Sequence, residues 1–370
     1  MYRYQHDLVK EEAIYIAGPE CFYTYGYDAL AAMKARALSL GFGVTLPNDH
    51  PLDMENPDLK KRADSIFEDL KRVMNETTII VSDLEAYRGA EPDSGTIYEI
   101  GMAYAKGARS YGYTRDLRSL QTKNQAAVLK DGKVYDERGN VMPYAKLPFS
   151  PTIIGSTKIV EGDFDDCLKM ILIDAAENRK SRTFRREVID NSARVTHNKG
   201  ERPLVYLAGF ERYEENGAEL FAAMKELCAK HGLDAVSPLD QAPGVELIQT
   251  EDPYVWAGNV FDNYQQHVRN CDAVIANLND YRGYEVNNDV GFECGMGFQL
   301  GKKLYGYMDN TDKLIHKIPH LGEEKEFRDQ TGSNVENFDY PANLMFACSM
   351  NILEGRFEEV IGKIAEDLKK

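Results

Sequence analysis

The sequence predicts an α/β protein built from two tandem doubly wound domains, each with a parallel sheet between helices. Two observations lead to this fold class. Short aliphatic runs alternate with amphipathic segments of helical length, the pattern of a parallel sheet covered on both faces. The second half then repeats the first: YRGAEPDSGTIYEIGMAYAKG starts at Tyr87 and YRGYEVNNDVGFECGMGFQLG at Tyr281, with Glu99 and Glu293 at one offset (293 − 99 = 194).

The elements of the first half follow one another in βα order. Continuous apolar runs such as TTIIVSDL are typical of strands buried on both faces, and the helical segments carry apolar residues at helical spacing. The expected strands are 12–18, 42–47, 77–84 and 110–114, and the expected helices are 27–41, 63–76, 96–107 and 163–180. The second half repeats this order from PLVYLAG to RFEEVIGKIAEDLKK.

The repeat suggests a division into a first domain, 1–180, and a second domain, 203–370. The segment between them, 181–202, is polar and charged, which suits a linker. Each half also carries a polar insertion before its last strand, at 116–147 and at 309–340. These insertions are too long for simple connections, so we expect lids or disorder.

Composition narrows the classes of partner. The formal charge of −16 disfavours a nucleic-acid partner, because phosphate binding usually needs a basic patch. The N-terminal residues lack the apolar core of a signal peptide, and no stretch is apolar enough for a membrane span, so we expect a cytoplasmic protein. The six cysteines form no CxxC pair and suit reduced, buried thiols.

Common cofactor and metal motifs do not occur. The sequence has no GxGxxG, Walker or GxSxG motif, which removes the usual signals of dinucleotide binding, phosphoryl transfer and a serine nucleophile. The histidines, His50 among them, show no metal-like pairing with acids, so each is interpreted as structural or exposed. We therefore expect no cofactor and no metal.

Ligands of open α/β sheets bind at the carboxyl ends of the strands, which directs attention to Asp93 and Glu99. The segment EPDSGTIYEIG places a loop aspartate before a helix and a glutamate near its first turn, where the helix dipole favours an ionised carboxylate. Two such carboxylates suit glycosyl transfer, with one attacking the anomeric centre and the other assisting. A solvated helix-start glutamate and a turn aspartate are the structural alternative.

The chain resembles the nucleoside 2-deoxyribosyltransferase family. The resemblance rests on IYIAGPECF, FEDLKR, IIVSDL, DSGTIYEIGMAYAKG, YGYTRDLRS and a late PANLMF, in the family's order and spacing. It implies a flavodoxin-like fold in each half and a glutamate that attacks the anomeric carbon and holds a covalent deoxyribosyl intermediate. Residue by residue, it implies the nucleophile Glu99, the sugar-orienting Asp93, Asp69 near the nucleobase, Tyr15 holding the glutamate, and Phe22 packing on the base. Gly18, Asp83 and Gly95 complete the expected substrate-binding loops.

The family also completes each site with an asparagine from a neighbouring subunit. That NLM segment survives in the second half, with Asn343 and Met345, while Ser150 takes the matching place in the first half. The resemblance therefore implies a fused pseudo-dimer in which the second repeat reaches across to the acids of the first, giving one competent site per chain. Further assembly into a homo-oligomer stays open, because the fusion itself can satisfy the dimer interface.

The second repeat keeps its glutamate but loses its acids. Glu293 and Tyr206 are retained, whereas Asn263, Asn277 and Asn287 stand at the offset of Asp69, Asp83 and Asp93. Amides bind ligands but do not donate a proton as acids do, so catalysis there should be weaker. A decayed structural site, a ligand-binding site and a second activity are all considered, and Asp289 is a further acid that could substitute for the lost ones.

The expected function is transfer of 2-deoxyribose between purine or pyrimidine bases of deoxynucleosides, in nucleoside salvage. The expected partners are therefore deoxynucleosides and free nucleobases. An N-glycoside hydrolase of deoxynucleosides or of their 5′-monophosphates is the alternative if water reaches the intermediate. A non-catalytic nucleoside- or nucleotide-sensing module is an alternative of another class.

Overall fold

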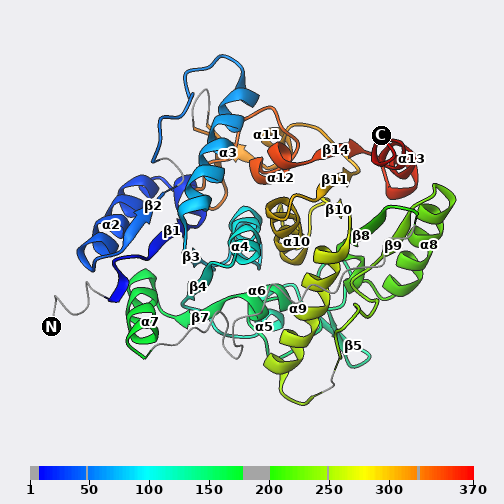
Figure 1. Cartoon of the computed structure of the whole chain (residues 1–370), viewed down its shortest axis with the longest axis horizontal. Coiled ribbons are helices and arrows are strands. Elements are labelled where there is room, and N and C mark those ends of the chain that lie inside the picture. Colours follow the sequence, from blue (N-terminus) through cyan, green and yellow to red (C-terminus); the bar gives the residue numbers. More distant parts are fainter. Residues whose placement is uncertain (1–7, 47–48, 178–200, 248–249, 323–325) are drawn as a thin grey trace.

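The structure is a computed structural model of the chain, and it describes residues 8–46, 49–177, 201–247, 250–322 and 326–370. Most of the expected linker, 181–202, lies outside these residues. The described part forms two α/β halves placed side by side (Figure 1). No helix in these ranges is both long enough and apolar enough to cross a membrane.

The first half contains a five-stranded parallel sheet. Its strand order is β2-β1-β3-β4-β7. This is the doubly wound order, in which all strands are parallel and successive strands are added on one side of β1 and then, from β3 onward, on its other side. The strands are β1 (Ala13–Ala17), β2 (Gly43–Thr45), β3 (Ile79–Asp83), β4 (Arg109–Thr114) and β7 (Lys158–Glu161). All five residues of β3 are buried, as its continuous apolar run predicts.

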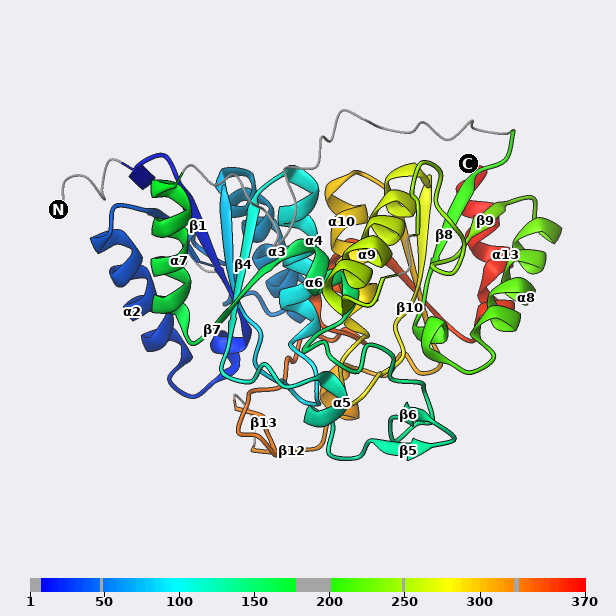
Figure 2. The same cartoon turned by 90° about the horizontal axis from the view of Figure 1, so that it is seen from below.

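Helices cover both faces of this sheet. The outer face carries α2 (Gly26–Ser39) and α7 (Phe164–Ala176), and the inner face, toward the second half, carries α3 (Leu59–Glu76), α4 (Ser94–Lys106) and the short α6 (Pro151–Ser156) (Figure 2). A 3₁₀ turn, η1 (Pro19–Phe22), follows β1. Helix α3 begins four residues before the predicted start, because Asp58 caps it by accepting a hydrogen bond from the Lys60 amide.

The second half repeats this architecture. Its parallel sheet has the order β14-β11-β10-β8-β9, the same topology as in the first half. The strands are β8 (Leu204–Ala208), β9 (Asp234–Val236), β10 (Ala273–Asn277), β11 (Lys303–Met308) and β14 (Asn351–Glu354). The helices are η2 (Phe210–Tyr213), α8 (Gly217–Lys230), α9 (Pro253–Asn270), α10 (Asn288–Gln299), α12 (Leu344–Ser349) and α13 (Phe357–Leu368). The predicted fold class, two doubly wound halves, is confirmed.

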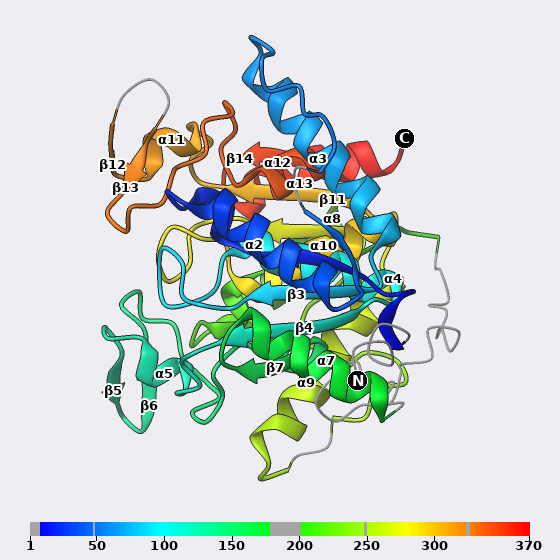
Figure 3. The same ribbon diagram turned by 90° about the vertical axis from the view of Figure 1, so that its left-hand side faces the viewer.

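Both insertions have structure of their own. The first contains α5 (Leu120–Lys123) and a hairpin of β5 (Val128–Lys130) with β6 (Lys133–Tyr135), and the second contains α11 (Leu314–Lys317) and a pair of β12 (His320–Leu321) with β13 (Arg328–Asp329). Both lie at the carboxyl-terminal edge of the sheets (Figures 2 and 3). They are ordered covers in their described parts, which rules out the disordered alternative there.

The two halves meet through α4 and α10, which run side by side between the sheets (Figure 2). Glycines allow this close approach: a Cβ on Gly101 would overlap the Phe292 carbonyl oxygen, and one on Gly295 would overlap the Tyr98 carbonyl oxygen. The largest apolar core cluster contains residues of both halves. The glycine two positions after each glutamate, Glu99 or Glu293, therefore serves helix packing between the repeats.

Candidate active site

Glu99 lies on α4 beside the end of β1. The Tyr15 hydroxyl donates a 2.6 Å hydrogen bond to Glu99 Oε1, and Glu99 is only 6% exposed. Burial raises the pKa of Glu99 to about 8, the charges of Asp93 and Glu20 add to the rise, and the Tyr15 hydrogen bond lowers it. A buried carboxyl held in one orientation by a tyrosine is suited to attack on an electrophilic carbon.

Burial opposes the expected effect of the helix dipole on Glu99. Helix α4 begins at Ser94, so Glu99 lies in its second turn, and the N-terminal amide of Thr96 is taken by Asp93. The dipole effect fades within the first turn, while the cost of burying a charge does not. Burial therefore dominates and favours the neutral acid.

Asp93 caps α4 and leaves one oxygen unused. Its Oδ2 accepts hydrogen bonds from the Thr96 amide, at 2.7 Å, and from the Thr96 hydroxyl, at 2.6 Å. Its Oδ1 is buried and has no hydrogen-bond partner in the described part of the chain. The cap fixes the carboxylate, and the free oxygen remains available to a ligand.

Asn343 approaches this loop from the second repeat. It caps α12, and its Oδ1 accepts a 2.9 Å hydrogen bond from the Met345 amide. A Cβ on Gly95 would lie 2.9 Å from Asn343 Nδ2, so the glycine gives the amide its space. The Met345 side chain packs against the shared core. Ser150 stands at the corresponding N-cap position of α6, where its side chain makes no capping hydrogen bond.

Asp69 projects from α3 and is almost fully buried. Its Oδ1 contacts His50 Nδ1, and its Oδ2 has no partner among the described residues. The contact joins residues 19 positions apart in the sequence, and sequence reasoning did not predict it. No group of three or more His, Cys, Asp or Glu suited to a metal occurs within the described ranges.

Aromatic rings and an arginine line the other side of the loop after β1. The Phe22 ring stacks on Tyr87 at 5.8 Å, and the guanidinium of Arg88 lies 4.6 Å from the Tyr87 ring centre. Arg88 Nε donates a 2.8 Å hydrogen bond to Asp329 of the second repeat's insertion. Sequence reasoning missed Arg88, although the repeated YRG motif, at Tyr87 and Tyr281, contained the signal.

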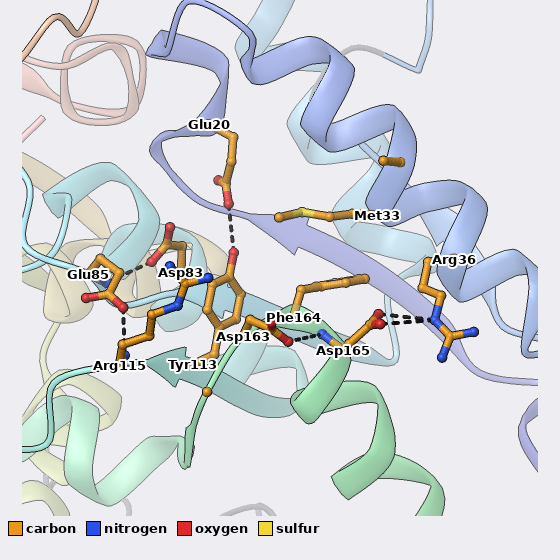
Figure 4. A pocket seen from close by; sticks show the side chains of 12 residues that line it. Glu20, Met33, Arg36, Asp83, Glu85, Tyr113, Arg115, Asp163, Phe164 and Asp165 are labelled. Carbon is orange, nitrogen blue, oxygen red and sulfur yellow. Dashed lines mark hydrogen bonds and ion pairs between the residues drawn. The ribbon is translucent and has the colours of Figure 1, made fainter.

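A cavity of about 730 Å³ opens next to this site, at the carboxyl ends of β1, β3, β4 and β7. Figure 4 shows Glu20, Asp83, Tyr113 and Arg115 around it. The Tyr113 hydroxyl donates a 2.7 Å hydrogen bond to Glu20, and burial with the Glu20 charge raises the pKa of Asp83 to about 7. Glu99 and Asp93 do not line this cavity. A Cβ on Gly18 would overlap the Glu20 carboxylate, so that glycine admits an acid which sequence reasoning also missed.

Comparison with protein-family models identifies the family of the chain. The family model described as nucleoside 2-deoxyribosyltransferase matches residues 14–144 and again 205–345, which together make up well over half of the chain. The chain belongs to the nucleoside 2-deoxyribosyltransferase family. The double match also confirms that it is a tandem-duplicated member.

Individual relatives are distant. An uncharacterized protein of Schizosaccharomyces pombe is 27% identical over 117 residues, which are 31% of this chain and 54% of that protein, so the match spans about half of the relative's length. The solved structure of a 2-deoxyribosyltransferase from Leishmania mexicana is 23% identical, with a TM-score of 0.34, and the match covers 44% of this chain and 97% of that one.

The second repeat of this deoxyribosyltransferase-family chain has a differently built pocket. The Tyr206 hydroxyl donates a 2.6 Å hydrogen bond to Glu293, as Tyr15 does to Glu99. Both oxygens of Glu293 are, in addition, held by Arg212, at 2.8 and 2.7 Å. Arg212 stands where the first repeat has Cys21, three residues after the glycine of each AG pair. This arginine was missed, and the paired segments IYIAGPECF and VYLAGFERY contained its signal.

The amides of the second pocket make structural hydrogen bonds. Asn287 caps α10 by accepting from the Val290 amide, and Asn263 bonds the backbone of Pro238, Asp240 and Ala242. The suggestion that Asp289 could replace a lost acid is wrong. Its carboxylate is buried, accepts hydrogen bonds from the Thr152 hydroxyl and from Tyr213, and stands at the position of Gly95.

Proposed function

We propose that the first repeat transfers 2-deoxyribose between the bases of deoxynucleosides through a covalent intermediate on Glu99, in nucleoside salvage in the cytoplasm. One observation carries the proposal: Glu99 is buried, oriented by Tyr15 and unpaired with any cation in the described structure, whereas its copy Glu293 is neutralised by Arg212. Family membership supports the same chemistry for the chain.

In the proposed first step, an oxygen of ionised Glu99 forms a bond to the anomeric carbon. The bond from that carbon to the base nitrogen breaks, its electron pair stays with the base, and the base takes a proton. We assign that proton to Asp69, which is buried and shares a hydrogen bond with His50. Asp93 orients the sugar with its free oxygen.

In the second step, a nitrogen of a different base attacks the same carbon, the bond to Glu99 breaks and leaves Glu99 as a carboxylate, and the proton of the incoming base returns to Asp69. A 2-deoxysugar lacks the electron-withdrawing 2-hydroxyl, so charge develops readily at the anomeric carbon and the carboxylate stabilises it. Water competes with the incoming base for the intermediate. The second repeat's insertion lies against the Phe22 loop through the Asn334 amide, which donates a 2.7 Å hydrogen bond to the Phe22 carbonyl, and this cover supports transfer over hydrolysis.

The first test is incubation of the protein with 2′-deoxyadenosine, with and without free hypoxanthine, followed by separation of the products. We expect 2′-deoxyinosine only in the presence of hypoxanthine. If free deoxyribose forms at the same rate with and without hypoxanthine, the protein is a hydrolase and not a transferase. Binding without any product would favour the sensing module.

Paired variants then test which repeat does the chemistry. Glu99→Gln should lower kcat/KM by more than about 10³-fold, because a neutral amide cannot form the glycosyl ester. Glu293→Gln is the matched control and should leave kcat/KM unchanged. Equal losses in the two variants would contradict the assignment of the reaction to the first repeat.

A further inference from the structure

Glu336 lies in the second repeat's insertion and is held against the first repeat's site. Two residues earlier, Asn334 bonds the first repeat twice: its amide donates to the Phe22 carbonyl at 2.7 Å, and its own carbonyl accepts from Arg88 at 2.8 Å. Arg328 also donates to the Phe22 carbonyl, at 2.9 Å. These bonds fix the backbone on both sides of β13 and leave little freedom to the segment that carries Glu336.

Both carboxyl oxygens of Glu336 are buried, no side chain in the described part of the chain hydrogen-bonds them, and the Leu344 backbone amide is the donor that acts on this carboxyl; the residue is only 5% exposed. An unpaired buried polar group costs free energy, more so when it can carry a charge. The second insertion forms its turn and its cover without this carboxylate, through Asp329 and Asn334. A single backbone amide, that of Leu344, does not satisfy both oxygens of a buried carboxyl group.

The groups around Glu336 are already engaged or acidic. Arg88 is bonded to Asp329 and to the Asn334 carbonyl, and Glu285 is bonded to the Ser94 hydroxyl at 2.5 Å. Burial raises the pKa of Glu336 to about 8, with the Asp93 and Glu285 charges adding to the rise and Arg88 opposing it. Burial raises the pKa of Cys21, and the charges of four carboxyl groups, those of Asp93, Glu336, Glu20 and Glu99, add to the rise.

Only the first pocket has this acid. The hydrogen bond from the Asp329 amide to the Ser333 carbonyl is repeated in the first insertion by that from Asp136 to Asn140, an offset of 193. The same offset places Pro143 opposite Glu336 (336 − 193 = 143). Glu336 thus lies by the first pocket, where Glu99 has no arginine partner in the described structure. Pro143 takes its place by the second pocket, where Arg212 pairs with Glu293.

We propose that Glu336 hydrogen-bonds a hydroxyl group of the deoxyribose, beside Asp93, and thereby selects nucleosides that carry no phosphate. The inference rests on the proposed function of the first repeat. A deoxyribose with its base at the anomeric carbon has two hydroxyl donors, and Asp93 Oδ1 and Glu336 are two buried acceptors that no side chain of the described part hydrogen-bonds. The Leu344 backbone, which acts on the Glu336 carboxyl, directly follows Asn343, so Glu336 lies near the cross-repeat amide. We assign the sugar to this side and the ring pair of Phe22 and Tyr87 to the base.

A phosphate group on either hydroxyl would lie among acidic side chains instead of the cationic and amide donors that bind phosphate. Phosphate binding uses arginine, lysine or backbone amides, and here the nearest arginine, Arg88, already serves Asp329 and Asn334. A dianion close to Asp93, Glu285 and Glu336 would be repelled by whichever of these groups is ionised. Selection against the 5′-monophosphate then follows from one residue supplied by the other repeat.

The test compares Glu336→Gln and Glu336→Ala with Glu326→Gln, an exposed glutamate of the same insertion, as the matched control. Dissociation constants are measured by calorimetry for 2′-deoxyadenosine, its 2′,3′- and 2′,5′-dideoxy analogues, and its 5′-monophosphate. The unaltered protein should bind one dideoxy analogue about 10- to 100-fold more weakly than 2′-deoxyadenosine. In Glu336→Ala this penalty should fall below about 3-fold for that analogue alone, and discrimination against the monophosphate should weaken.

Glu336→Gln keeps the size of the side chain and guards against misfolding, with thermal unfolding as the check. It should bind the monophosphate better than the unaltered protein does. If both Glu336 variants discriminate among the four compounds as the Glu326 control does, the proposal is overturned. Turnover of 2′-deoxyadenosine, measured separately, reports on the proposed function: hydroxyl-dependent binding without turnover would refute the transferase and keep the role of Glu336, and absence of binding would refute both.

Discussion

Glu99 and Glu293 accept the same tyrosine hydrogen bond and differ in one further contact. Arg212 fills both oxygens of Glu293, while Glu99 has no such cation. A carboxylate in a two-pronged arginine pair is a weak nucleophile, because attack would break the pair and leave a buried guanidinium. The difference was readable from the sequence as Cys21 against Arg212, but only the fold shows that this position faces the glutamate.

The pH dependence of kcat/KM should reflect the raised pKa of Glu99. The nucleophile must be ionised and burial raises its pKa to about 8, so kcat/KM should rise with pH up to that value. Tyr15→Phe removes the hydrogen bond that lowers this pKa, so the rise should move to higher pH. Measured pH profiles of the two proteins check this, and a profile that is flat from pH 6 to 9 would contradict a buried acid as the nucleophile.

At the scale of elements, each insertion covers the pocket of the other repeat. The Asn334 amide bonds the Phe22 carbonyl, and the Val141 amide bonds the Tyr213 carbonyl in the same way. Two buried arginines hold the covers: Arg88 bonds Asp329, and Arg282 bonds Asp136 at 3.0 Å. The sequence predicted strands, helices and lids. The sequence could not predict that each insertion covers the pocket of the other repeat. Turn residues and hydrophobic periodicity report on neighbouring residues, whereas these hydrogen bonds join residues far apart in the sequence.

Substituting lysine for Arg88 and for Arg282 should distinguish the effect of each insertion on access of water from its effect on the stability of the fold. Arg88→Lys and Arg282→Lys both keep the charge and lose the forked hydrogen bonds, so each should lower the free energy of unfolding by about 1–3 kcal/mol. Only Arg88→Lys should raise the ratio of free deoxyribose to exchanged nucleoside severalfold, because only its cover lies over Glu99. The ratio is measured by chromatography. An equal rise in the two variants would show that general loosening, not the cover, controls water.

At the scale of the whole molecule, the two repeats form one pseudo-symmetric body around α4 and α10. Sequence offsets revealed the duplication and the place of Asn343 opposite Ser150, and these residues occupy the N-cap positions of α12 and α6, where only Asn343 makes a capping hydrogen bond. The domain limits 1–180 and 203–370 stay a prediction, since the segment between them lies largely outside the described residues. The largest apolar core cluster contains residues of both repeats, so the two repeats share a hydrophobic core.

One reactive site per chain predicts a simple stoichiometry. Rapid mixing with a deoxynucleoside in the absence of acceptor, acid quenching and intact-mass measurement should give at most one deoxyribosyl adduct per chain, on the peptide that contains Glu99. Glu99→Gln should abolish the adduct and Glu293→Gln should not. Two adducts per chain would show that the second pocket also reacts, despite Arg212.

The exchanged covers also bear on the order in which the protein becomes functional during its synthesis. The strand, tyrosine and glutamate of the first pocket are translated early, but Asn334, Glu336 and Asn343 come from a segment near the other end of the sequence. A nascent chain that has folded its first sheet therefore holds a glutamate exposed to water, with neither cover nor cross-repeat amide. Exchange of bases would begin only after the second sheet has docked, so the duplication couples the onset of activity to completion of the fold.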